Sequence, residues 1–357
     1  MTTSTAAPAA DPVDPVRFAV VGYGAGGRFF HAPVLAGAPG CELVAVVTSD
    51  PGRAELARAE HGVRTVAALE ELPALGVEAV AVSTPAATHT DLTERALRLG
   101  LAVVCDKPFA LDTAAARGTV ELAAELGVPL TAYQNRRWDS DLLTVRRVLD
   151  EGALGEVTRL ESSFERWAAG DPPAAGAGLL RDFGAHLVDQ ALHLLGPVET
   201  VAAQTRSLPG GGEDDWRVQL RHRSGVTSEL SGSWKQAAPG PRFRVTGSRG
   251  TFVLEAAMDG QEAALLAGRT PRGEGEAWGV EPPHRWGWLR LGDGPVSRVP
   301  SEPGCWPELY RLFALAVRGR GPVPVDPWDA VATTAVVDAA RRAAAESATV
   351  AVTDPRD

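Results

Sequence analysis

Three side chains far apart in the chain have the types that chemistry at a hydroxyl-bearing carbon needs. Lys107 follows a short apolar run, and Asp182 and His186 stand four residues apart in a helix-like segment. A histidine can take a hydroxyl proton, a carboxylate can orient its ring, and an ammonium can stabilise a developing alkoxide. Because positions i and i+4 share a helix face, we predict that Asp182 orients His186 and that both meet Lys107.

A glycine-rich segment indicates a dinucleotide site. Gly22, Gly24 and Gly27 form a GxGxxG pattern between an apolar run and a helix-like segment. The first glycine permits a tight turn, the second lets the backbone approach a pyrophosphate, and the third lets the helix pack closely on the strand. A merely flexible glycine loop is the weaker interpretation, because a strand precedes the pattern and a helix follows it. We predict that this turn, with Tyr23, binds NADP or NAD.

The end of the next apolar run bears on the choice between these cofactors. Thr48 and Ser49 stand where a carboxylate would select NAD, and Arg53 lies one turn into the following helix. Hydroxyls can donate to the 2′-phosphate of NADP and an arginine can pair with it, so NADP is favoured. Asp50 keeps NAD open. Asp50 and Pro51 also fit an ordinary helix cap and first helical residue.

A metal site is the alternative use of the Asp182 to His186 segment. Asp189 and His193 continue the same helical spacing, and Asp and His at that spacing can share a cation. We predict no metal, because no Glu or Cys cluster accompanies them and hydride transfer needs none. Asp189 and His193 are instead expected to be buried polar groups, hydrogen-bonded between two domains.

The first third of the chain predicts the sheet that would position the glycine turn and Lys107. Apolar runs at 18–21, 43–47, 79–82, 101–105 and 129–132 alternate with helix-like segments at 53–60, 88–99 and 113–126. This alternation is typical of buried parallel strands joined by helices. We predict a doubly wound Rossmann domain over residues 17–134, after a disordered tail at 1–16 that lacks the features of a signal peptide.

The rest of the chain, residues 135–357, predicts a substrate-binding domain of a different kind. Strand-like runs follow one another at 157–164, 198–203, 216–221, 226–234, 243–246 and 251–254, with helices at 139–151, 179–195, 307–317 and 328–347. Successive strands of this kind favour an open, mainly antiparallel sheet, so the fold class is α/β in both halves. Two stretches rich in Pro and Gly, 168–178 and 271–283, are expected to be long loops.

Composition limits the partners. A net charge of -10 over 357 residues argues against nucleic acid and anionic lipid. Cys41, Cys105 and Cys305 show neither paired nor zinc-binding spacing, which favours a reducing cytoplasm. Since no run reaches about 18 apolar residues, we expect no membrane span, and the expected partner is a small molecule.

An ordered set of motifs resembles the Gfo/Idh/MocA family of oxidoreductases. After the glycine pattern come Ser83-Thr84-Pro85 with His89, then Cys105-Asp106-Lys107-Pro108, and then Asp182-Phe183-Gly184-Ala185-His186. The resemblance runs from Arg17 to about Val352. Residues 135–139 and 182–197 are most similar to the scyllo-inositol dehydrogenase (NADP-dependent) branch of that family.

The resemblance implies an active site between the two domains and hydride exchange between a sugar-like carbon and C4 of nicotinamide. It places Lys107, Asp182 and His186 at the reacting carbon. It places Ser83, Thr84, Pro85, His89, Asp106 and Lys107 beside the cofactor. Asp106 stands where the family usually has Glu, which shortens the side chain by one methylene. The open sheet of this fold often pairs with another subunit, so a homo-oligomer is expected.

Several alternatives stay open. His31 and His89 could each line the cofactor crevice or only cap and pack a helix. The first hypothesis for function is an NAD(P)-dependent dehydrogenase or reductase of a polyol, sugar or cyclitol. The others are a non-catalytic dinucleotide-binding regulator, against which Lys107, Asp182 and His186 argue, and a glycosidase that keeps its NAD tightly bound. The substrate and the direction of reaction remain open.

Overall fold

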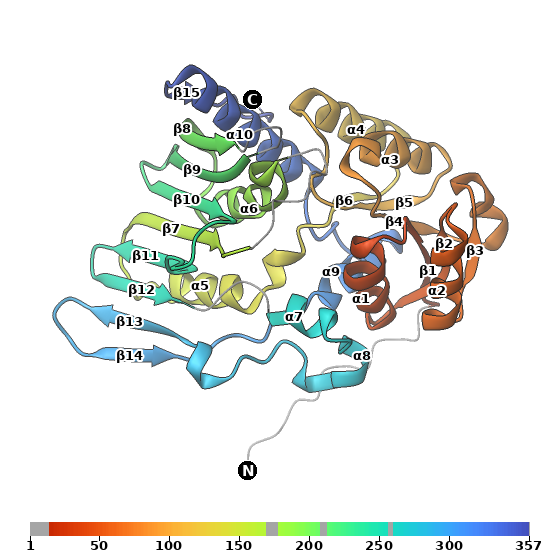
Figure 1. Ribbon diagram of the computed structural model, residues 1–357, viewed down its shortest axis with the longest axis horizontal. Helices are drawn as coiled ribbons and strands as arrows, with labels where there is room; N and C mark the ends of the chain where they lie inside the picture. The colour runs from red at the N-terminus through yellow and green to blue at the C-terminus, as the bar shows by residue number, and fades with distance from the viewer. Residues whose placement is uncertain (1–13, 169–177, 208–212, 256–259, 357) are drawn as a thin grey trace, which may run out of the picture.

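The computed structural model describes residues 14–168, 178–207, 213–255 and 260–356. Two sheets lie side by side in it, the parallel one at the right of Figure 1 and the larger one at the left. The predicted tail lies outside the described residues as far as residue 13. Val16, which the prediction placed in the tail, is the fully buried first residue of the first strand, because its side chain joins the core.

The first sheet has six parallel strands in the order β3-β2-β1-β4-β5-β6. The strands are β1 (Val16–Val21), β2 (Cys41–Val47), β3 (Arg64–Val66), β4 (Ala79–Val82), β5 (Ala102–Cys105) and β6 (Leu130–Ala132). This order is that of a Rossmann fold, and it confirms the predicted doubly wound sheet. It reverses direction between β1 and β4, where ligands of such sheets bind beyond the carboxyl ends of the strands.

Alternate residues of these strands supply two apolar cores, one on each face of the sheet. On one face, residues such as Phe18 and Val20 pack against α1 (Ala32–Ala36), α2 (Pro51–His61) and α9 (Pro307–Val317). On the other face, residues such as Ala19 and Val21 pack against α3 (His89–Arg98), α4 (Thr113–Leu126) and the start of α10 (Pro327–Glu346). Helices near the end of the chain therefore complete the core of the first sheet, although the prediction assigned them to the second domain.

The second sheet has nine strands in the order β14-β13-β12-β11-β7-β10-β9-β8-β15. Its strands are β7 (Val157–Glu165), β8 (Val198–Ser207), β9 (Glu213–His222), β10 (Thr227–Ser233), β11 (Phe243–Gly247), β12 (Gly250–Leu254), β13 (Gly287–Leu291), β14 (Val296–Val299) and β15 (Val350–Ala351). Strands β7 and β10 pair in parallel and the other neighbours are antiparallel. The predicted open, mainly antiparallel sheet is confirmed.

One face of this second sheet is apolar and covered by helices. Leu160, Val218 and Leu230 point to that face and pack against α5 (Ser140–Asp150), α6 (Ala185–Leu195) and α10. Glu161 and Glu229 alternate with them and point to the other face, as the two-residue period of a strand requires. Helix α10 also packs against α4, so it lies between the two sheets in Figure 1.

Several elements differ from the prediction. Strands β3, β13, β14 and β15 were missed, as was the helix α7 (Gly260–Leu266). The expected loop 271–283 contains the short helix α8 (Pro271–Glu274) and the 3₁₀ turn η7 (Gly275–Ala277). Thr270 starts α8, because its hydroxyl accepts from the Gly273 N–H, at 3.1 Å. Most of the other expected loop, residues 169–177, lies outside the described residues.

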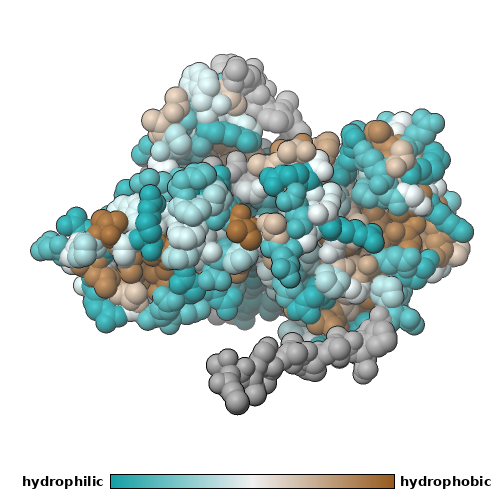
Figure 2. Space-filling view, turned by 90° about the horizontal axis from the view of Figure 1, so that it is seen from below, coloured by the Kyte–Doolittle hydropathy of each residue, from teal (hydrophilic) through white to brown (hydrophobic). Residues whose placement is uncertain are grey.

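The surface is mainly hydrophilic on the face drawn in Figure 2, and hydrophobic residues lie there in separate patches. In the parts of the chain that the structure describes, no helix is both long enough and apolar enough to cross a membrane.

Candidate active site

The glycine turn between β1 and the π-helical turn η1 (Gly26–His31) is shaped by the protein at two positions and open at a third. Gly22 has φ +93°, and a Cβ on it would lie 2.6 Å from the Ser83 carbonyl oxygen. A Cβ on Gly27 would collide with the carbonyl oxygen of Gly22. A Cβ on Gly24 would meet no described atom within 4 Å. The turn is therefore tightly packed below Gly24 and leaves room above it, as close approach of a pyrophosphate requires.

Tyr23 does not present its side chain to this opening. It is 2% exposed, and its hydroxyl donates to the Glu60 carboxylate on α2, at 2.7 Å. Burial raises the pKa of Tyr23, and the hydrogen bond to Glu60 raises it further. The side chain thus holds α2 against the sheet. Only the backbone of Tyr23 remains available to a cofactor, which narrows the role predicted for this residue.

The end of β2 was predicted both to cap the next helix and to contact the ribose of the cofactor. Asp50 caps α2, since its carboxylate accepts from the Arg53 N–H at 2.9 Å. The Thr48 hydroxyl accepts from the Asp50 N–H at 3.3 Å. The predicted cap is confirmed, while Ser49 and the Arg53 side chain are exposed at the same edge of the sheet. The Asp50 carboxylate is exposed at this edge as well, and its second oxygen accepts no hydrogen bond from the residues that the structure describes, so Ser49, Asp50 and Arg53 can all face a ribose or its phosphate.

Asp106, just beyond β5, joins the loops that border the glycine turn. Its carboxylate accepts from the Ser83 hydroxyl at 2.8 Å and from the Lys107 N–H at 2.7 Å, and it lies 3.1 Å from His31 Nε2. Burial would raise the pKa of Asp106, but His31, Lys107 and His89 together hold it well below its usual range. The carboxylate is therefore a buried anion that ties the Ser83 loop, the Lys107 turn and η1 together.

His31 and His89 are packed into the interior, 0% and 1% exposed. His31 Nδ1 lies 2.6 Å from the hydroxyl of Tyr310 on α9, and the His31 ring lies against Tyr133 with centroids 4.0 Å apart. His89 lies between the carbonyl oxygens of Thr84 and Pro108. Of the two roles left open for these histidines, the structure supports packing behind the crevice.

The loop after β4 presents the remaining residues predicted at the cofactor. Thr84 is partly exposed and Pro85 is exposed. The Thr84 hydroxyl lies 2.7 Å from the Thr88 hydroxyl, at the end of the 3₁₀ turn η4 (Ala86–Thr88). A Cβ on Gly22 would also lie 2.8 Å from the Thr84 Cγ2 methyl group. This loop and the glycine turn therefore form one continuous edge of the crevice.

Lys107 and Asp182 meet between the two sheets. The Lys107 ammonium donates to the Asp182 carboxylate. Asp182 lies on the π-helical turn η6 (Leu180–Gly184), which belongs to the part of the chain that forms the second sheet. The side chains are 26% and 45% exposed, so both remain accessible to a small ligand. The Lys107 ammonium also lies 5.4 Å from the centre of the Phe183 ring.

His186 lies at the start of α6, but the predicted support from Asp182 is wrong for this structure. Asp182 pairs with Lys107 instead, because its turn is π-helical and the wider turn changes the i, i+4 alignment. His186 is 3% exposed, and its buried Nδ1 has no hydrogen-bond partner among the residues that the structure describes. Burial holds the pKa of His186 well below its ordinary value, and the charges of Arg136 and Lys107 lower it further. The ring is therefore neutral.

The other pair considered on this helix has a structural role. Asp189 is buried and accepts from the Arg137 guanidinium at 2.6 and 2.9 Å, which confirms the predicted buried polar contact for this residue. The same prediction is wrong for His193, which is exposed. Arg137 also donates to Asp329 at 3.0 Å. His193 lines a separate cavity of about 210 Å³ with Arg137 and Asp329. Within 14–168, 178–207, 213–255 and 260–356, no His, Cys, Asp or Glu group could hold a metal ion.

Sequence reasoning missed the buried charges behind His186. Arg136 is 5% exposed and pairs with Asp139 and Glu262. Arg242 is 2% exposed and donates to Asp141 at 2.8 Å. Arg136 lies in the 135–139 stretch that carried part of the family resemblance, which was the available signal. Arg242 stands in an ordinary Pro-Arg-Phe context and gave none.

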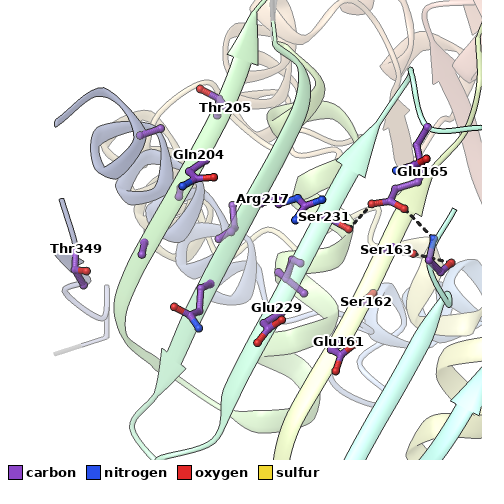
Figure 3. Close-up of a pocket in the computed structure, with 18 of the residues that line it drawn as sticks. Glu161, Ser162, Ser163, Glu165, Gln204, Thr205, Arg217, Glu229, Ser231 and Thr349 are labelled. Atoms are coloured by element: carbon purple, nitrogen blue, oxygen red, sulfur yellow. Dashed lines mark hydrogen bonds between the residues drawn. The ribbon is translucent and has the colours of Figure 1, made fainter. Parts of the chain in front are cut away.

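A wide depression lies elsewhere, on the polar face of the second sheet. It has a volume of about 970 Å³ and is lined by side chains such as Glu161, Arg217 and Glu229. Figure 3 shows these side chains on neighbouring strands, with Glu165 bonded to Ser231. None of the residues predicted at the reacting carbon or the cofactor lines it.

A Rossmann sheet with an open glycine turn, and a lysine and a buried neutral histidine beside it, defines a nucleotide-dependent oxidoreductase. Comparison with known families agrees. Residues 16–134 match the model of the oxidoreductase family with an NAD-binding Rossmann fold, and residues 142–253 match the GFO/IDH/MocA C-terminal domain. The chain belongs to the Gfo/Idh/MocA family of oxidoreductases.

Similar proteins cover nearly the whole chain. The uncharacterized oxidoreductase YdgJ of Escherichia coli is 33% identical, over 94% of this chain and 99% of its own length. The scyllo-inositol 2-dehydrogenase (NADP(+)) IolW of Bacillus subtilis is 30% identical, over 95% of this chain and 96% of its own. The crystal structure of an oxidoreductase from Klebsiella pneumoniae is 33% identical with a TM-score of 0.85, and the match covers 94% of this chain and 95% of that one.

Proposed function

We propose that this enzyme exchanges a hydride between NADP and a secondary alcohol or ketone of a cyclitol, sugar or polyol. The observation that carries the proposal is the Lys107–Asp182 ion pair between the two sheets, next to the buried neutral His186. The names of its relatives support the substrate class, since IolW acts on scyllo-inositol. A bound nicotinamide cofactor would accept or supply the hydride, on the open side of the Gly22–Gly27 turn.

The protein's own groups would then manage the proton and the charge. In oxidation, the neutral ring of His186 takes the substrate hydroxyl proton. The Lys107 ammonium stabilises the oxygen that loses this proton. Asp182 holds that ammonium in place, rather than orienting His186 as the spacing suggested. In reduction each proton movement runs in reverse.

A substrate panel tests the proposal. Inositols, aldoses and polyols are incubated with each oxidised cofactor, and the nicotinamide absorbance is followed. Net turnover with a cyclitol or sugar is the expected result. Binding of cofactor without turnover on any compound would favour the dinucleotide-binding regulator. Glycoside cleavage without net cofactor change would favour the glycosidase.

The preference for NADP over NAD is part of the proposal. Ser49 and Arg53 are exposed at the end of β2, where a hydroxyl and a guanidinium can bind a 2′-phosphate. Titration of the protein with each oxidised cofactor should show tighter NADP binding, and Arg53→Ala should narrow the difference. If Arg53→Ala left the ratio of NADP to NAD affinity unchanged, or if the parent protein bound NAD more tightly, the predicted NADP preference would be wrong.

We also propose a homo-oligomer that forms through the polar face of the second sheet. That face is broad, carries the depression of Figure 3 and bears both acidic and basic side chains, such as Glu229 and Arg217, which suits a hydrated interface. Light scattering on the purified protein should give a multiple of the chain mass, and Arg217→Glu with Gln219→Glu should shift it to the monomer. A monomeric parent at micromolar concentration would contradict this interface.

A cytoplasmic location completes the proposal. Cys41, Cys105 and Cys305 are free thiols, as a reducing compartment would keep them. Cell fractionation with an antibody against the protein tests it, and recovery from a secreted fraction would contradict it.

A further inference from the structure

His89 is a buried histidine whose two ring nitrogens both face backbone carbonyl oxygens. It begins α3, directly behind the cofactor crevice, and is 1% exposed. Its Nδ1 lies 2.8 Å from the Pro108 oxygen and its Nε2 lies 2.8 Å from the Thr84 oxygen. A carbonyl oxygen only accepts, and a neutral imidazole has one N–H. Both contacts are hydrogen bonds only when both nitrogens carry hydrogen, which makes the ring an imidazolium.

His222 is the natural contrast in the second sheet. It is equally buried, but its Nδ1 lies 2.8 Å from the Gly196 oxygen and its Nε2 lies 2.8 Å from the Ser228 hydroxyl. A hydroxyl can donate, so a neutral ring with hydrogen on Nδ1 satisfies both contacts. Burial lowers the pKa of His222, in keeping with a neutral ring. The two histidines therefore differ in partner chemistry rather than in exposure.

The two carbonyl groups at His89 belong to the two loops that border the site. Thr84 follows Ser83, whose carbonyl oxygen packs against Gly22 of the glycine turn. Pro108 follows Lys107 in the turn after β5. His89 is thus a bridge between the loop that shapes the cofactor crevice and the turn that carries the Lys107 ammonium.

A buried cation needs a nearby anion, because burial without one is costly. Asp106 supplies it. The side chain of Asp106 is 15% exposed, and His89 is one of the groups whose charge acts on it. The same carboxylate accepts the Lys107 N–H at 2.7 Å, so Asp106 and His89 bond to neighbouring backbone groups of the same turn.

We propose that His89 is held as an imidazolium and is a positioning residue that fastens the Lys107 turn to the Thr84 loop. A neutral ring in this place would leave one carbonyl oxygen facing a nitrogen lone pair. Loss of one buried hydrogen bond would loosen the turn and with it the position of the Lys107 ammonium.

The charge is tested by ¹⁵N NMR on the full-length protein with ¹⁵N-labelled histidine, without cofactor and near neutral pH. His89→Gln and His222→Gln assign the signals. We expect two protonated nitrogens at His89 and one protonated with one unprotonated nitrogen at His222. One unprotonated nitrogen at His89 would overturn the proposal. Asp106→Asn provides a second variant, in which the removal of the anion should cost His89 its second proton.

The positioning role is tested by hydrogen exchange of the Lys107 N–H, a readout that does not depend on catalysis. In His89→Gln the exchange should accelerate about tenfold, as expected for one lost buried hydrogen bond, while His222→Gln leaves it within about twofold. If the Lys107 N–H of a folded His89→Gln protein exchanged at the parental rate, the positioning role of His89 would be overturned.

A third measurement rests on the proposed function, because it needs a substrate. Single-turnover hydride transfer in His89→Gln should fall about tenfold, with an unfolding temperature equal to that of His222→Gln. A parental transfer rate in that variant would overturn the positioning role. If the parent itself shows no turnover while the NMR and exchange results hold, the proposed function fails and the charge and role of His89 stand.

Discussion

The two sides of the active site differ in how completely their polar groups are satisfied. On the cofactor side, Asp106 and His89 are surrounded by protein partners, and the glycine turn is packed against the Ser83 loop. On the reacting side, Asp182 is 45% exposed and the buried Nδ1 of His186 has no partner among the described residues. Buried polar groups are rarely left unpaired, since each costs stability. The polar side chains behind the cofactor crevice are therefore largely engaged by the protein, whereas the Asp182 carboxylate on the reacting side keeps exposed surface for a ligand.

Substitution on the reacting side should give the largest effect on turnover with little effect on binding. Lys107→Ala and His186→Ala should each lower single-turnover hydride transfer by roughly 10²-fold or more, the usual size of a general acid–base contribution. Cofactor affinity, measured by fluorescence titration, should stay near the parental value because the Gly22–Gly27 turn carries that binding. A folded His186→Ala variant with near-parental transfer would exclude that histidine as the principal base.

Substitution on the cofactor side should separate packing from binding within a single turn. Gly27→Ala should lower the free energy of unfolding by about 1–3 kcal/mol, because the added Cβ collides with the Gly22 carbonyl oxygen. Gly24→Ala should leave stability unchanged, since no described atom lies within 4 Å of its Cβ, and should weaken cofactor binding instead. Denaturant unfolding and cofactor titration on both variants measure the two effects. Equal loss of stability in both would break the distinction between a packed and an open glycine.

The pH dependence of His186 offers a third way to separate the two sides. Its pKa is held well below the ordinary value of 6.5 by burial and then by Arg136 and Lys107, so the ring stays neutral as the pH falls through the usual histidine range. The oxidation rate should stay level there and fall only below the lowered pKa. The unfolded chain binds this proton more readily, so stability contributed by neutral His186 is present above pH 6.5 and is lost below it.

His186→Asn is the matched variant for this pH prediction. Its free energy of unfolding should decrease less than that of the parent when the pH is lowered from about 7 to about 5. The same variant of His222 controls for burial, because burial also lowers the pKa of that histidine outside the site. A parental rate that falls with an ordinary histidine pKa would show that His186 is not the desolvated base described here.

The same contrast explains what sequence reasoning reached and what it missed. Five of the six Rossmann strands and the glycine turn depend on local signals, namely apolar runs and glycines at fixed spacing, so they were predicted closely. Strands β3 and β14 were missed because they are short and contain few buried residues, with no apolar run to mark them. Arg136 and Arg242 were missed because charged residues in a sequence indicate a surface, and their burial depends on partners distant in the chain.

The partner of Asp182 was missed for a related reason. The i, i+4 spacing assumes a regular α-helix, but η6 is π-helical, and a single extra residue in a turn leaves no periodic signal. The Lys107–Asp182 pair joins residues 75 positions apart on different halves of the chain, which no local pattern encodes. The resemblance to the family predicts Lys107, Asp182 and His186 together at the reacting carbon, and the structure pairs Lys107 with Asp182.

The smallest expected effect comes from Asp182→Asn, which distinguishes a carboxylate that orients His186 from one that holds Lys107. If Asp182 oriented His186, Asp182→Asn would disturb the base and shift the pH profile of oxidation. If Asp182 holds Lys107, as the structure has it, Asp182→Asn keeps a hydrogen-bond acceptor for the ammonium and loses only its charge. Hydride transfer should then fall by about tenfold or less, since a partly exposed ion pair contributes on the order of 1 kcal/mol.

The design of that experiment uses the double variant. Asp182→Asn should have little further effect in a Lys107→Ala background, because the residue it acts on is gone, while in a His186→Ala background its effect should persist. Single-turnover rates for the three backgrounds give the two coupling energies. Coupling to His186 that exceeds coupling to Lys107 would restore the arrangement predicted from the spacing, and would mean that Asp182 changes partner when substrate enters the site.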